Sequence, residues 1–135
     1  MSSVKNIFKI LENAKIDKKV GIKLAKILDG ESFNLYCLEI APKKRVTAHY
    51  HSFGNETYQI IKGKAVMMIG VQENDTIKWQ EPKKMYENDC LNVKANEIHQ
   101  LINTENSPLI CIVTCSISHI TNDRVITTGY EKEIN

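Results

Sequence analysis

Residues 49–63 read HYHSFGNETYQIIKG and place two of the chain's four histidines two positions apart, with a glutamate five positions after the second. Alternate residues of a β-strand lie on one face, so His49 and His51 would point the same way. The segment SFGN has turn chemistry, and a second strand starting at Glu56 would place Glu56 and Tyr58 on one face. If the two strands pair through this turn, both imidazoles and the carboxylate can meet in one interior.

Composition limits the number of domains and the kinds of partner. The 135 residues are 42% hydrophobic and 25% charged, with a net charge of +2, so we expect a single domain over residues 1–135. Nothing in this charge balance indicates a nucleic-acid partner, and no apolar stretch is long enough to span a membrane. The N-terminus lacks a signal-peptide core, and the four cysteines form no C-x-x-C motif. We therefore expect buried free thiols in a reducing cytoplasm.

Strand-like segments follow one short helix. Residues 4–13 carry Val4, Phe8 and Leu11 at helical spacing, which predicts an amphipathic helix. After it, short runs rich in Ile, Val, Leu and Tyr alternate with turn residues, which is typical of an antiparallel sandwich or barrel. Residues 72–87 indicate an extra hairpin. The expected strands are 20–28, 32–40, 46–51, 57–61, 65–71, 76–80, 90–93, 98–102 and 109–116.

A third histidine widens the candidate site. Two neutral imidazoles and a carboxylate suit a divalent transition metal. His99 begins another strand-like run, HQLIN, whose face it shares with Asn103. A closed antiparallel barrel would bring this strand to the same interior, although the spacing alone does not place His99 beside the other three residues. The alternative is a polar barrel interior that binds its ligand directly, without metal.

The histidine-containing segments resemble the cupin superfamily. The first cupin motif is H-x-H, four residues, E, six residues, G, and it is matched by His49, His51, Glu56 and Gly63. The second motif ends in H-x-x-x-N, which His99 and Asn103 match. The turn residues of both motifs differ: positions that usually hold glycine or proline hold Lys43, Asn88, Lys94 and Asn96. Asparagine is the non-glycine residue that best tolerates a left-handed turn, so two of these changes are mild.

The resemblance implies an all-β fold, a double-stranded β-helix or jelly-roll barrel over about residues 20–116, with the short helix before it. It also implies one divalent transition metal per chain (Mn, Fe, Ni or Zn) and a homodimer. The implied metal ligands are His49, His51, Glu56 and His99.

Function is less determined, because the cupin fold supports many reactions. Our leading hypothesis is an isomerase, epimerase or lyase that acts on a small carbohydrate or organic acid, with Tyr58 transferring a proton. A cavity tyrosine is, however, somewhat more often a core residue whose hydroxyl is hydrogen-bonded. The alternatives are an Fe(II) dioxygenase and a non-catalytic module that binds a metal or a small ligand.

Two polar residues lie beyond the last good strand. We interpret His119 as a turn or surface histidine, with a lid over the barrel mouth as the alternative. Arg124 could bind an anionic substrate group, but a single exposed arginine is more often only solvated.

Overall fold

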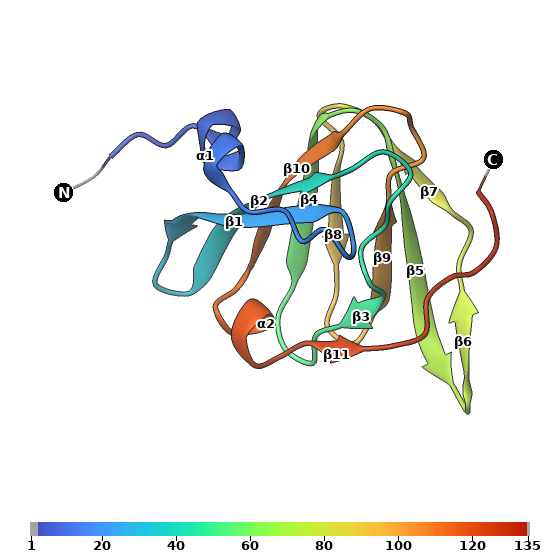
Figure 1. Cartoon of the computed structure of the whole chain (residues 1–135). Helices are drawn as coiled ribbons and strands as arrows, with labels where there is room; N and C mark the ends of the chain where they lie inside the picture. The colour runs from blue at the N-terminus through green and yellow to red at the C-terminus, as the bar shows by residue number, and fades with distance from the viewer. Residues whose placement is uncertain (1–2, 135) are drawn as a thin grey trace.

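A computed structural model describes residues 3–134, so the first two residues of the N-terminal segment, 1–17, lie outside the described part (Figure 1). The chain forms two packed antiparallel sheets with one short helix before them. This confirms the all-β, double-stranded β-helix expectation. The elements are α1 (Ile7–Asn13), β1 (Ile22–Asp29), β2 (Phe33–Ile40), β3 (His49–Tyr50), β4 (Glu56–Lys62), β5 (Ala65–Glu73), β6 (Thr76–Trp79), β7 (Lys83–Met85), β8 (Cys90–Val93), β9 (Ile98–Ile102), β10 (Leu109–Ser116), α2 (Ser118–Thr121) and β11 (Val125–Ile126).

The two sheets are built from strands that are distant in sequence. One sheet has the order β1-β2-β10-β4-β8, and the other has the order β11-β3-β9-β5-β6, with β7 also paired to β5. The predicted hairpin in residues 72–87 is confirmed, because β6 turns back onto β5 through Asn74 and Asp75. Two short strands, β7 and β11, were not predicted. Each has at most three residues, too few for a period to be visible in the sequence.

The main core lies between the sheets and follows from period-two alternation. In β4, Glu56, Tyr58 and Ile60 are buried while the residues between them are half-buried, so the predicted shared face is confirmed. Strand β5 adds Met67 and Ile69 from the opposite sheet. Glu56 is thus a carboxylate within an otherwise largely apolar interior.

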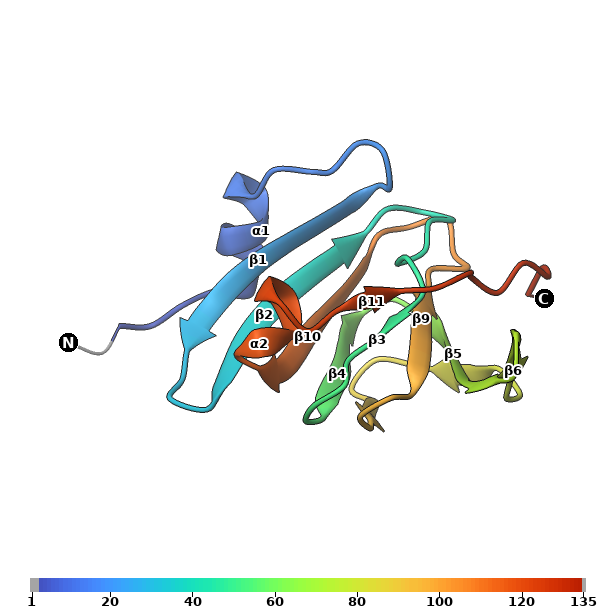
Figure 2. The ribbon, with the colours of Figure 1, turned by 90° about the horizontal axis from the view of Figure 1, so that it is seen from below.

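Helix α1 covers the outer face of the first sheet, beside β1 and β2 (Figures 1 and 2). It begins at Ile7 because the side chain of Asn6 caps it, accepting from the backbone N–H of Lys9 at 3.1 Å. The buried face is Leu11 with Ile7 and Ile10 partly covered. Of the predicted face only Leu11 is buried, since Val4 is 99% exposed and precedes the cap, and Phe8 is 44% exposed.

The four cysteines differ in their exposure to solvent. All four cysteines are free; Cys37, Cys111 and Cys115 are buried, but Cys90 is exposed, which contradicts the expectation that all four are buried. Cys90 lies on β8, an edge strand of its sheet. Within residues 3–134, no helix has the length and apolar character that crossing a membrane requires.

Candidate metal centre

The four predicted ligands come together from both sheets. His49 on β3 lies directly opposite His99 on β9 in the strand register, with ring centroids 4.3 Å apart. Glu56 comes from β4 in the other sheet, so β3 and β4 face each other across the interior and do not pair. The two strands do not pair through SFGN, a pairing that the sequence left as a condition, because this turn carries the chain from one sheet to the other. The side chains still converge.

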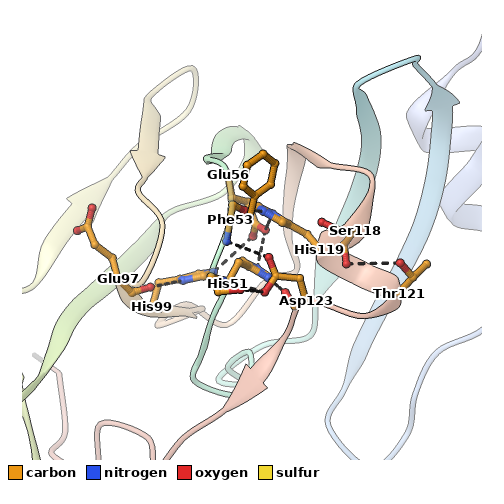
Figure 3. A network of polar contacts seen from close by, with 10 residues as sticks. His51, Phe53, Glu56, Glu97, His99, Ser118, His119, Thr121 and Asp123 are labelled. Atoms are coloured by element: carbon orange, nitrogen blue, oxygen red, sulfur yellow. Dashed lines mark hydrogen bonds and ion pairs between the residues drawn. The ribbon is translucent and has the colours of Figure 1, made fainter.

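Backbone carbonyls orient the three imidazoles, and Figure 3 shows two of them, His51 and His99, with Asp123 and Glu97. The Nδ1 atom of His49 lies 2.7 Å from the carbonyl oxygen of Thr47, and that of His99 lies 3.1 Å from the carbonyl oxygen of Glu97. The Nδ1 atom of His51 lies 2.5 Å from the carbonyl oxygen of Asp123. A carbonyl can only accept, so each Nδ1 carries the hydrogen and each Nε2 presents a lone pair. This is the tautomer that a metal-binding imidazole requires.

The donor set fits a divalent metal. One ligand atom from each of His49, His51, Glu56 and His99 lies within 4.8 Å of all the others, and all four side chains are buried. The Nε2 atoms of His51 and His99 are 2.8 and 3.4 Å from carboxylate oxygens of Glu56, yet neither makes a hydrogen bond among the described residues. Two buried nitrogen atoms without hydrogens or partners are costly unless a cation accepts their lone pairs.

His119 is the site residue that the sequence analysis missed. It is fully buried on α2, so its interpretation as a turn or surface histidine was wrong. Its ring stacks on His51 with centroids 4.0 Å apart, and its Nδ1 lies 3.2 Å from Oε2 of Glu56. Its Nε2 donates to the carbonyl of Phe53. A buried histidine in a short helix beyond the last long strand has no sequence signal, because only the closure of the barrel places it.

The pKa shifts in the cluster favour a neutral His49, an ionised Glu56 and a charged His119. Burial and the neighbouring His99 lower the pKa of His49 to about 3, and the charge of Arg124 adds to this effect. Burial raises the pKa of Glu56, but the contact with His119, whose Nδ1 donates to the carboxylate when that ring is protonated, is the largest opposing cause, and the pKa of Glu56 stays below its usual range. Burial would lower the pKa of His119, but Glu56 and the Phe53 carbonyl raise it. Glu56 is therefore a carboxylate, as a metal ligand must be.

A cavity of about 400 Å³ opens onto the cluster, with His49, Glu56 and Tyr58 among its lining residues. Tyr58 is 3% exposed, and its ring meets His99 edge-on at 5.9 Å between centroids. Burial first, and the Glu56 carboxylate second, raise the pKa of Tyr58 well above its usual value. Arg124 also lines the cavity, so it does more than extend into solvent.

Three of the four departures from the cupin motifs coincide with left-handed backbone; Lys94 does not. Lys43, Asn88 and Asn96 have φ values of 62°, 74° and 67°, and the retained Gly63 has 98°. These turns therefore keep the shape that glycine normally serves, and asparagine supports it at two of these three left-handed positions. Asn103 is structural, because its amide donates to the carbonyls of Ile40, Ala41 and Ser107.

Comparisons with known proteins agree with this fold. A family model described as mannose-6-phosphate isomerase C-terminal matches residues 15–129. No curated protein matches the sequence significantly. Among solved structures, a double-stranded β-helix protein of Klebsiella pneumoniae has a TM-score of 0.71 at 14% identity, over 96% of this chain and 100% of that one.

Two further structures belong to proteins with named functions. KdgF of a Halomonas species has a TM-score of 0.67 at 11% identity, over 85% of this chain and 94% of that one. Oxalate oxidase in complex with the substrate analogue glycolate has a TM-score of 0.70 at 13% identity, over 87% of this chain and 61% of that one. At such identities these likenesses support the fold alone.

Proposed function

Because the chain belongs to the mannose-6-phosphate isomerase C-terminal family, a group of cupin-type domains, we propose that it is a metal-dependent enzyme acting on a small polar metabolite. The proposed metal ligands are His49, His51, Glu56 and His99, with one divalent ion per chain. The proposal keeps the cytoplasmic setting expected from the sequence.

One observation carries this proposal. Three imidazoles have their Nδ1 atoms bound to backbone carbonyls, which turns three Nε2 lone pairs toward one buried carboxylate. A structural core has no use for such an arrangement, because unpartnered polar atoms destabilise it. The cluster also borders a cavity large enough for a metabolite, as an enzyme site requires.

The chemistry we favour is isomerase, epimerase or lyase chemistry. A divalent metal held by His49, His51, Glu56 and His99 would supply Lewis acidity that polarises a substrate carbonyl. The chain's own contribution is to bind, orient and protonate the substrate. Tyr58 is the proposed proton-transfer residue, because its buried hydroxyl keeps its proton at neutral pH and borders the same cavity as Glu56. The cavity's apolar walls would keep water from the reacting atoms.

Metal content is the first test of this function. Untagged protein should contain about one Mn, Fe, Ni or Zn per chain by elemental analysis, and the Glu56→Gln variant should lose most of it. Glu12→Gln, an exposed carboxylate on α1, is the matched control and should keep the metal. If Glu56→Gln does not fold, His99→Gln replaces it. Wild-type protein that holds no metal after reloading would overturn the proposal.

Turnover is the second test. Tyr58→Phe should keep its metal and lose roughly a hundredfold in activity, the usual contribution of a positioned acid or base. Full activity in that variant would remove Tyr58 from the mechanism. Oxygen uptake by the Fe(II) form would favour the dioxygenase alternative, and a metal-loaded protein without turnover on any metabolite would favour the binding module.

A further inference from the structure

The lining of the cavity above the metal centre indicates which kind of metabolite it takes. The cavity contains about 400 Å³, within the usual range for small-molecule sites of roughly 300–1,000 Å³. His49, Glu56 and Tyr58 border it and are at most 4% exposed, whereas Lys15 and Arg124 border it and are exposed. The cavity therefore has a buried floor at the metal-ligand cluster and a positively charged mouth.

The walls between floor and mouth are aliphatic. They include Ile22, Leu24, Leu38, Val46, Val113 and Ile120. Thr47 and Tyr58 are the only uncharged side chains with hydroxyl groups among the lining residues, and Thr47 is exposed. Between the polar floor and the charged mouth, the hydroxyl groups of a carbohydrate would face aliphatic side chains without hydrogen-bond partners, which costs free energy for each one. A hydrocarbon segment would instead gain from burial against these side chains.

The charges at the mouth favour an anion. Lys15 and Arg124 have no ion-pair partner among residues 3–134. Glu56 lines the buried floor, so Asp17 is the one exposed carboxylate among the lining residues, and its Oδ1 already accepts from the backbone N–H of Lys19 at 3.0 Å. Two free cations against one engaged carboxylate leave a net positive mouth. An arginine guanidinium binds a carboxylate through two parallel hydrogen bonds.

We propose that the site binds a small organic acid with an oxygen donor at the metal end, an apolar middle, and a carboxylate at the mouth between Lys15 and Arg124. The proposal rests on the proposed function, because the oxygen donor needs the metal. It decides between the two substrate classes in favour of the organic acid over the carbohydrate. The reason is that the walls offer contact surface and few hydrogen-bond partners.

A binding experiment with three probes tests the ligand class. Calorimetry on metal-loaded wild-type protein should show 4-oxopentanoate binding at least about tenfold more tightly than 2-pentanone, which has a methyl group in place of the carboxylate. It should also bind more tightly than mannose 6-phosphate, an anion with a polyhydroxyl body. Stronger binding of mannose 6-phosphate, or equal binding of 2-pentanone, would overturn the proposal.

Charge-removing variants test the mouth. The double variant Lys15→Gln/Arg124→Gln should lose about tenfold in affinity for 4-oxopentanoate while its metal content stays at the wild-type level. Lys9→Gln, an exposed cation on α1 outside the cavity, should bind as wild type does. Unchanged affinity in the double variant contradicts this inference alone. Missing metal in the wild type contradicts the proposed function itself, so the two failures are distinguishable.

Discussion

Lys43 holds a left-handed backbone conformation that costs an ordinary residue free energy. Its φ is 62°, at a position where cupin motifs usually have glycine, and its side chain reaches only the carbonyl of Thr104 at the surface. An L-residue in this region loses about 1–2 kcal/mol relative to right-handed conformations, because its Cβ approaches the following carbonyl. Glycine avoids this contact. The surrounding structure therefore holds this turn in place, although the left-handed conformation is unfavourable for lysine.

This strain predicts a stabilising substitution. Lys43→Gly should raise the free energy of unfolding by about 1 kcal/mol, measured by urea denaturation of metal-free protein. Lys43→Ala is the control, because it also removes the Thr104 contact but keeps a Cβ. The alanine variant should be no more stable than wild type. A glycine variant no more stable than the alanine variant would show that the backbone here is not strained.

His49 predicts a loss of stability in acid for the metal-free protein. Its pKa is about 3 when folded, against 6.5 for a free histidine, so below pH 6.5 the unfolded chain binds a proton that the folded chain does not. The free energy of unfolding therefore decreases as the pH is lowered below 6.5, with a slope approaching about 1.4 kcal/mol per pH unit. The pKa of Glu56 is lowered from 4.5 in the folded chain, so protonation of Glu56 reduces stability only below pH 4.5. The pKa of His119 is raised from 6.5 in the folded chain, so its stabilising contribution is fully present below pH 6.5 and does not change further there.

The window between pH 6.5 and 4.5 therefore isolates His49 from these two neighbours. Urea denaturation of chelator-treated protein across this window should show a steeper fall for wild type than for His49→Asn. Parallel curves for the two proteins would mean that His49 is not kept neutral by the fold.

At the scale of elements, residues 118–126 tie the C-terminal part of the chain to the metal centre. Helix α2 delivers His119 to Glu56, and β11 pairs with β3, the strand of His49. Between them, Asp123 accepts hydrogen bonds from the backbone N–H groups of Ser52 and Phe53 and from the hydroxyl of Ser52. The carbonyl of Asp123 also binds His51. The backbone carbonyl of Asp123 thus orients the proposed ligand His51, while the Asp123 side chain fixes the loop in place.

Asp123→Ala should consequently weaken metal binding by about tenfold without removing a ligand. The side chain fixes the loop whose carbonyl orients His51, and groups that orient metal ligands typically contribute 10–100-fold in affinity. The measurement is competition with a chelator, together with hydrogen exchange, which should accelerate in residues 118–126. Asp75→Ala, in the exposed turn between β5 and β6, is the matched control. Wild-type affinity in Asp123→Ala would separate the loop from the site.

At the scale of the whole molecule, the outer faces of both sheets are unequally covered. Helix α1 packs on the first sheet around Leu11, and the C-terminal residues Tyr130 and Ile134 pack against Met68 on the second. Strand β1 stays at an edge, with Leu28 47% and the neighbouring Phe33 52% exposed. An open edge with exposed apolar side chains is a common site of self-association.

The homodimer implied by the cupin resemblance is consistent with this surface and stays a prediction. Light scattering coupled to gel filtration should give twice the 15.4 kDa of one chain at micromolar concentration. The variant Leu28→Glu should shift the protein toward the monomer if β1 forms the interface. A wild-type monomer under these conditions would contradict the dimer.

Local chemistry made much of this protein readable from the sequence. Period-two alternation predicted the inward face of β4 with Glu56 and Tyr58, and turn residues predicted most strand boundaries, because both signals lie within a few neighbouring residues. The motif H-x-H, E and G likewise indicated candidate metal ligands, because imidazole and carboxylate groups are typical ligands of divalent transition metals. Asparagine at two positions that usually hold glycine in the motifs predicted that the left-handed turns would be kept.

Only the tertiary structure decided which residues meet across the barrel. His119 joins Glu56 from 63 residues away, and the Asp123 carbonyl reaches His51 across 72 residues, through loops without any periodic pattern. The positive mouth of the cavity likewise combines Lys15 with Arg124 from opposite ends of the chain. Such neighbours arise when two sheets close around one core, and that closure is a property of all the strands together. No local stretch of sequence encodes it, so these contacts became visible only in the folded chain.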